Sequence, residues 1–152
     1  MMMATTFITF NLTRFPGKIQ DMEKTQKLQN SKTQNKQKIY DLEERIRNFF
    51  ERVIKLCKKI KVTPITRRQI DQLIGAAGSV GANYLEASEA MSRKDFNKGI
   101  KIARKEAKES RVWLHGLKTA VDFEDPEFEA LAQEAKEFVF IFTSILEKTD
   151  RK

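Results

Sequence analysis

The sequence contains few of the residues from which metal centres, disulfide frameworks and turn-rich folds are built. Among 152 residues there are one cysteine and one histidine, which excludes a zinc cluster, a disulfide framework and a Cys-Cys redox pair. With three prolines and six glycines, a sandwich of short strands is not expected. No run reaches the roughly 18 apolar residues of a membrane span. We therefore expect a soluble, cytoplasmic protein with no cofactor, no metal and no membrane partner.

Basic residues are in excess, and they are unevenly distributed. The chain has 29 Lys and Arg against 21 Asp and Glu, a formal net charge of +8. Residues 91–121 contain nine basic and three acidic residues, whereas residues 122–152 contain four basic and nine acidic residues. A basic segment followed by an acidic one suggests a polarised surface with a polyanionic partner. A solvated lysine face plus a basic tail is the alternative.

The first 38 residues differ in composition from the rest of the chain. Residues 22–38 are rich in Lys, Gln, Asn and Thr, so they cannot bury enough apolar surface to offset the entropy lost on ordering. Residues 1–21 lack the basic start and small-residue cleavage site of a secretory signal. We expect a disordered or partly ordered basic tail over 1–38 and a folded domain over 39–150. Translation could start at Met1 or at Met22.

Four segments of the folded domain repeat apolar residues at alternating intervals of three and four, as a bundle helix requires. The first stripe consists of Ile39, Leu42, Ile46, Phe49, Val53, Leu56 and Ile60. The second runs from Ile70 to Ser88 and includes three glycines, for which close approach of a neighbouring helix is the expected reason and a kink the alternative. The third runs from Phe96 to Val121, and the fourth from Phe128 to Ile145.

Capping signals separate these segments. The expected signals are Thr63-Pro64 ending the first helix, a capping box of Thr66 with Gln69, Ser92 with Asp95, and Asp125-Pro126 opening the fourth helix. Helices joined by short loops pack against their sequence neighbours in opposite directions. The sequence therefore predicts an all-α fold, an antiparallel up-down-up-down four-helix bundle.

A stripe of lysines follows the third helix on the side opposite its apolar residues. The lysine stripe consists of Lys94, Lys98, Lys101, Lys105 and Lys108, with Arg93, Arg104 and Arg111 beside it. Successive lysines rise by about 5 Å along a helix, which suits contacts with nucleic-acid phosphates. Few aromatic residues interleave these lysines, so we expect recognition by charge and shape rather than by base reading. A solvated helix face is the alternative.

Some apolar residues lie outside the predicted core stripes. A small bundle has one interior, so this excess predicts contacts between subunits. The predicted interface residues are Phe50, Ile54, Cys57, Trp113, Phe140 and Ile141. A wide core stripe with scattered surface residues is the alternative.

The sequence offers no catalytic constellation. His115 is the only imidazole and is expected to be a packing or interface residue rather than a base. Cys57 is expected to be a small buried apolar group rather than a nucleophile. A di-metal site in a bundle pairs Glu with Glu-x-x-His motifs, and no second histidine exists. We therefore expect no enzymatic activity.

Residues 72–117 resemble the signature of the 23S rRNA-intervening sequence proteins, small bacterial four-helix bundles related to the accessory variability determinant proteins of diversity-generating retroelements. The matching residues are Ser79, Gly81, Ala82, Asn83, Glu86, Ala87, Ser92, Asp95, Phe96, Ile102, Ala103, Glu106, Ala107, Glu109, Trp113 and Leu114. The family usually has basic residues where Ile74-Gly75 and Leu85 stand here. That departure leaves the third helix and the tail as the candidate nucleic-acid contacts.

The resemblance implies a homo-oligomer, a pentameric barrel, that binds structured RNA or DNA. In the retroelement branch it implies a reverse transcriptase as partner, and the residues do not decide between the two branches. Together with the lysine stripe, it predicts a non-enzymatic accessory protein that binds nucleic acid, with structured RNA ahead of DNA. The alternative is a protein-interaction scaffold without a nucleic-acid ligand, whose basic face binds an acidic partner or whose acidic fourth helix binds a basic one.

Overall fold

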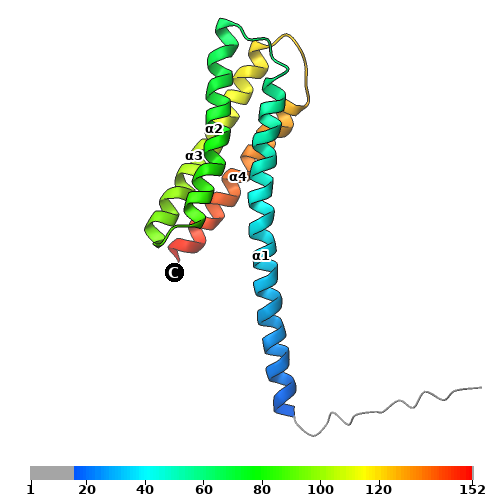
Figure 1. Cartoon of the computed structure of the whole chain (residues 1–152), viewed down its shortest axis with the longest axis vertical. Helices are drawn as coiled ribbons and strands as arrows, with labels where there is room; N and C mark the ends of the chain where they lie inside the picture. Colours follow the sequence, from blue (N-terminus) through cyan, green and yellow to red (C-terminus); the bar gives the residue numbers. More distant parts are fainter. Residues whose placement is uncertain (1–15, 152) are drawn as a thin grey trace, which may run out of the picture. The chain divides into compact units, whose positions relative to one another are not determined.

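The described chain is entirely helical in the computed structural model (Figure 1). The structure describes the backbone of residues 16–151 and the side chains of residues 24–30 and 42–151. It contains α1 (Pro16–Cys57), α2 (Pro64–Ser88), α3 (Arg93–Ala120) and α4 (Glu127–Asp150). The chain divides into two compact units, residues 1–40 and 41–152. The second unit is a helical bundle, and its α3 carries the lysine stripe.

The first unit differs from the expected disordered tail. The helix α1 begins at Pro16, so residues 16–38 are helical, and the remainder of the predicted tail lies outside the described residues. Lys, Gln and Glu lose little rotamer freedom in a helix, so this composition favours helix even where it cannot form a core. The described side chains of this segment, residues 24–30, are all exposed.

The boundary of α2 corrects the predicted capping box. The cap is Thr63, whose Oγ1 accepts a 3.1 Å hydrogen bond from Thr66 N, while Thr63 N donates to Thr66 Oγ1 at 2.8 Å. Thr66 is therefore the third helical residue, and Pro64 opens α2, where its missing N–H leaves no bond unmade. At the start of α3, Ser92 caps Asp95 N as predicted.

The start of α4 keeps the predicted interaction with a small shift. Asp125 Oδ1 accepts a 2.9 Å hydrogen bond from Glu127 N, although the helix itself begins at Glu127, one residue later than expected. The carboxylate satisfies one of the amides that a helix N-terminus leaves unpaired.

The apolar stripes form one core in the second unit. The fully buried large side chains include Phe49 of α1, Leu73 of α2, Leu114 of α3 and Phe138 of α4. The rings of Phe49 and Phe138 meet edge to face, with centroids 5.4 Å apart, a favoured aromatic geometry. Every helix of the bundle therefore contributes to the same interior.

Two of the α2 glycines let α1 pack closely. A Cβ at Gly78 would lie 3.3 Å from ring atoms of Phe50, and a Cβ at Gly81 would lie 3.3 Å from Ile46 Cγ2. This supports the expected close approach at both positions. Gly75 has no such neighbour within 4 Å, so close approach does not explain it.

Candidate nucleic-acid interface

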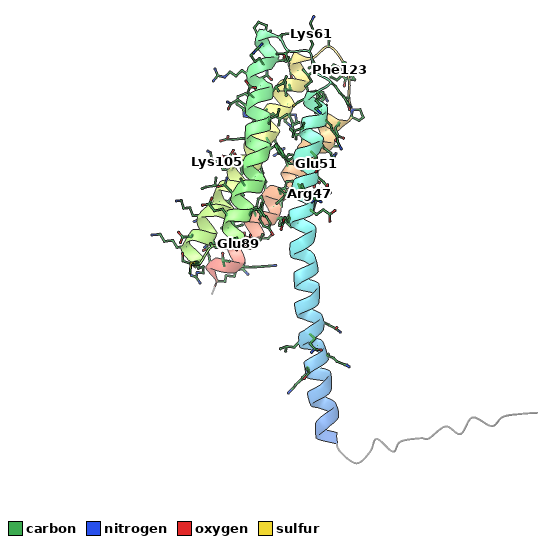
Figure 2. The ribbon with its side chains drawn as sticks, viewed as in Figure 1. Arg47, Glu51, Lys61, Glu89, Lys105 and Phe123 are labelled. Atoms are coloured by element: carbon green, nitrogen blue, oxygen red, sulfur yellow. The ribbon has the colours of Figure 1, made fainter. Side chains whose placement is uncertain are left out.

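The lysine stripe lies on the solvent side of α3. Lys94, Lys98, Lys101, Lys105 and Lys108 are all exposed, whereas Ile100, Ala103 and Ala107, which lie between them in sequence, are completely buried. In Figure 2, Lys105 lies at one edge of the bundle, away from Arg47 and Glu51 of α1. The local cause is the helical period, which separates the two residue types onto opposite faces.

One lysine of the stripe is paired within its own helix. Lys105 Nζ lies 3.3 Å from Glu109 Oε1 and 3.7 Å from Glu106 Oε1, and the bond to Glu109 raises the pKa of Lys105. Among residues whose side chains the structure describes, the other four lysines of the stripe form no ion pair. The stripe therefore presents four unpaired ammonium groups along one helix face.

Three of the six carboxylates of α4 pair with arginines of α1. Arg45 binds Glu134 through Nε at 2.6 Å and also contacts Glu137. Arg52 forms a two-point contact with Glu127, at 2.6 and 3.1 Å. We call these contacts, with Lys59–Asp125 at 2.8 Å, the α1–α4 ion-pair series. Arg45 and Arg52 are seven residues apart, which keeps them on one side of α1, and Lys59 follows at the same spacing in the turn after α1.

The α1–α4 ion-pair series also perturbs titration. Hydrogen bonds from Arg45 and Gln133 lower the pKa of Glu137, and the bond from Lys59 lowers the pKa of Asp125. The main cause in both cases is a cation that favours the ionised carboxylate. Three carboxylates of α4, Glu127, Glu134 and Glu137, are thus compensated inside the bundle and are less available to a basic partner.

A second set of contacts joins α3 to α4 at seven-residue intervals. Asn97 Nδ2 donates to Asp150 Oδ1 at 3.1 Å, Arg104 Nη1 donates to Thr143 Oγ1 at 3.3 Å, and Lys118 Nζ donates to Glu129 Oε1 at 2.8 Å. We call this the α3–α4 contact series. Each step of seven along α3 is matched by a step of seven backwards along α4, so the two helices keep a constant register.

The α3–α4 contact series has one position without a complementary pair. The register places Arg111 of α3 opposite Lys136 of α4. Within the described part of the chain, Arg111 Nε is buried without a hydrogen-bond partner. Two like charges therefore occupy a position where the neighbouring steps have complementary groups. Lys136 was not among the predicted contact residues, although it lies seven residues from both Glu129 and Thr143 and therefore on the same face of α4.

The arginines predicted to bind nucleic acid beside the lysine stripe differ in their exposure. Arg93 is exposed at the first turn of α3, whereas Arg104 is half-buried and donates a hydrogen bond to Thr143 of α4. The predicted basic surface is thus one exposed stripe with a second, partly buried row of arginines beside α4.

The predicted interface residues are not one continuous exposed patch. Cys57 is buried, and Phe50 is half-buried against Gly78, so contacts inside the bundle account for both. Trp113 and Ile141 are half-buried and pack against the core, and Ile54 is half-buried. Phe140 is the member that remains open, at 59% exposure. Phe50 and Cys57 belong to a core face of α1 that is wider than a strict two-position stripe.

The groups that could take part in catalysis lie apart from one another. Burial raises the pKa of the Cys57 thiol to about 11, which suppresses the thiolate at neutral pH. His115 is exposed on α3. Over the described residues, no three His, Cys, Asp or Glu side chains are grouped as a metal site would require. No helix in the described part of the chain is long and apolar enough to cross a membrane.

Comparison with known proteins places this geometry in a family. No curated protein sequence is significantly similar to the chain. A crystal structure from Bacteroides thetaiotaomicron, described as a protein of unknown function from the S23 ribosomal protein family, is similar with a TM-score of 0.59 and 28% identity. The similarity covers 68% of this chain and 96% of that one. The family description 23S rRNA-intervening sequence protein matches residues 39–144. This match spans the whole bundle except its last turns, and the chain therefore belongs to the 23S rRNA-intervening sequence protein family.

Proposed function

We propose that the protein binds structured RNA through the lysine stripe of α3, without reading base sequence. The observation that carries the proposal is the division of charge between helices. Four lysines of the stripe are exposed and unpaired within the described residues, while Arg45 and Arg52 of α1 and Lys59 after it pair with carboxylates of α4 and of the loop before it. Lysine ammonium groups along one helical face would displace the counterions condensed on the RNA phosphates, and this release is the main source of affinity in such contacts.

The same division of charge argues against the scaffold alternative. A basic partner of α4 would have to compete with the α1–α4 ion-pair series, whose arginine contacts with Glu134 and Glu127 are short. An acidic protein could occupy the lysine stripe, but a regular row of charges on a helix suits a polymer with regularly spaced phosphates better. The family description names an rRNA insertion, which agrees with an RNA ligand and motivates testing RNA first.

The assembly that we propose is an up-down-up-down bundle that forms a homopentamer. The α3–α4 contact series and the packing of Phe50 and Ile46 on Gly78 and Gly81 support antiparallel neighbours. Symmetric copies would present several lysine stripes to one RNA and increase its avidity. Light scattering of the purified chain should give five times the monomer mass. In the retroelement branch, a reverse transcriptase would share the RNA; co-purification of the two proteins tests that partnership.

The central experiment removes charge from the stripe and from a matched surface. The variant Lys98→Gln, Lys101→Gln, Lys108→Gln should bind a structured RNA duplex more weakly and lose about three units of salt slope, near one per phosphate contact. The control is Lys55→Gln, Lys58→Gln, Lys61→Gln, because these α1 and loop lysines are also exposed and form no ion pair in the described region. Equal loss in both variants would mean that only net charge matters. Unchanged affinity in the α3 variant would refute the stripe.

A further inference from the structure

We infer that Arg111, Lys136 and Phe140 form a second subsite, which binds an unpaired nucleotide: its phosphate between the two cations and its base on the Phe140 ring. The inference rests on the proposed RNA-binding function and adds a class of ligand, single-stranded RNA. The lysine stripe alone would not distinguish a single strand from a duplex. This subsite lies on the α4 flank of α3, beside the stripe.

The first observation is the mismatch in the α3–α4 contact series. Lys118 meets Glu129 one step along, and Arg104 meets Thr143 one step back, so the seven-residue register sets Arg111 opposite Lys136 between them. Two cations at adjoining positions repel each other unless an anion lies between them. Arg111 Nε is buried without a hydrogen-bond partner within the described residues, so no side chain of the bundle satisfies this donor. A buried donor without a partner costs free energy that a bound acceptor would recover.

The second observation is that local carboxylates cannot supply the anion. The carboxylates nearest to Lys136 along α4 are Glu129, Glu134 and Glu137. Lys118 engages Glu129, and Arg45 engages Glu134 and Glu137 on the opposite flank of the helix. An external anion would complete the position, and an oxyanion such as phosphate suits a guanidinium and an ammonium group.

The third observation is an exposed aromatic ring at the same place. Phe140 is 59% exposed, and Lys136 Nζ lies 5.9 Å from its ring centroid. Lys136, Phe140 and Thr143 follow one another at intervals of four and three, so they share one face of α4, and Thr143 binds Arg104. The ring thus lies among cations that attract nucleic acid, and base stacking on an exposed aromatic ring is a general mode of single-strand binding.

The experiment separates stacking, phosphate binding and fold. A fluorescently labelled 12-nucleotide single-stranded RNA and a structured duplex are each titrated with the full chain by anisotropy at several salt concentrations. Phe140→Ala should weaken single-strand binding about fivefold or more and leave binding of inorganic polyphosphate unchanged. Phe140→Trp should restore single-strand binding, because an indole ring offers a larger stacking face.

A charge reversal tests the cation pair without a loss of folding. Lys136→Glu gives Arg111 a carboxylate in the register that Glu129 offers to Lys118, so its melting temperature should equal or exceed that of the wild type. Its single-strand affinity should fall about tenfold, and its salt slope should decrease by one unit or more. A stable Lys136→Glu protein that binds single-stranded RNA like the wild type would overturn the subsite.

The outcomes also distinguish this inference from the proposed function. Two results together support the lysine stripe and the subsite. Duplex binding is lost only in the α3 lysine variant, and single-strand binding is lost in Phe140→Ala. If the lysine variant binds duplex normally but Phe140→Ala loses the single strand, the subsite stands and the stripe fails. If Phe140→Ala lowers the oligomer mass together with RNA affinity, the ring is a contact between copies and the inference is wrong.

Discussion

Two surfaces of the bundle carry similar cations but use them differently. On the α1 surface that faces α4, Arg45, Arg52 and Lys59 each bind a carboxylate of α4 or of the loop before it. On the outer surface of α3, only Lys105 of the lysine stripe is paired in the described structure, and its partners belong to the same helix. The α1 cations therefore contribute to holding the bundle together, whereas the α3 cations are available to a ligand. Net charge alone would not separate these two roles.

The largest expected effect is the loss of folding stability when the two arginines of the α1–α4 ion-pair series are replaced. Arg45→Gln with Arg52→Gln should destabilise the fold by about 2 kcal/mol, since two partly buried, two-point contacts are lost and their carboxylates remain together. Urea unfolding monitored by circular dichroism measures the change. The affinity for duplex RNA should stay close to that of the wild type. A variant with wild-type stability would show that these contacts are incidental.

Acid should reduce the stability that the α1–α4 ion-pair series contributes to the fold. The pKa values of Glu137 and Asp125 are lowered by Arg45 and Lys59, so their stabilisation is present above the unfolded-state values near 4–4.5 and is lost as the pH falls through the folded-state values. Melting temperatures recorded from pH 7 to pH 3 should drop below about pH 4.5. The drop should be smaller in the Arg45→Gln, Arg52→Gln protein. An equal drop in both proteins would assign acid sensitivity to other carboxylates.

A smaller effect is expected at the one paired lysine of the stripe. Glu109→Gln should remove the nearer of the two carboxylates that pair with Lys105, at 3.3 Å, leaving only Glu106 at 3.7 Å, and it removes a negative charge beside the stripe. The affinity for duplex RNA should rise a few-fold at low salt, and the gain should disappear at high salt because exposed charges are screened. Anisotropy titration at two salt concentrations gives the answer. Weaker binding in this variant would count against the stripe as the contact surface.

The smallest effect should be on the stability of the α3 lysine variant. Because Lys98, Lys101 and Lys108 form no ion pair within the described residues, replacing them with Gln should leave the melting temperature within about 2 °C of the wild type. Differential scanning fluorimetry measures this. A marked decrease would show that the lysines have a structural role, and the comparison between the two surfaces would fail.

Features with a local cause could be predicted from the sequence. The burial of Ile46, Phe49 and Val53 follows from a period that each helix sets by itself. The cap at Ser92 is equally local, since its hydroxyl binds an amide only three residues away. The α2 cap was misplaced from Thr63 to Thr66 because both threonines can cap, and Pro64 decided between them.

Features that depend on the register between helices could not be predicted. The pairing of Arg52 with Glu127, and the placement of Arg111 opposite Lys136 by the register, require knowing which turn of one helix lies beside which turn of another. The same limit applies to Phe50 and Cys57, which looked like surplus apolar surface until the width of the α1 core face was known. The helix in residues 16–38 was not predicted because the expectation relied on apolar burial, whereas helix propensity favours a helix even where no side chain is buried.

The constant register between α3 and α4 limits how the chain can change in length. An extra residue inside α3 between Arg104 and Lys118 would rotate everything beyond it by about 100°, so Lys118 could no longer reach Glu129 while Arg104 still met Thr143. An extra residue among 121–126, between the two helices, would leave both spacings intact. Insertions and deletions among relatives should therefore accumulate in this connection, and the helices should keep their lengths.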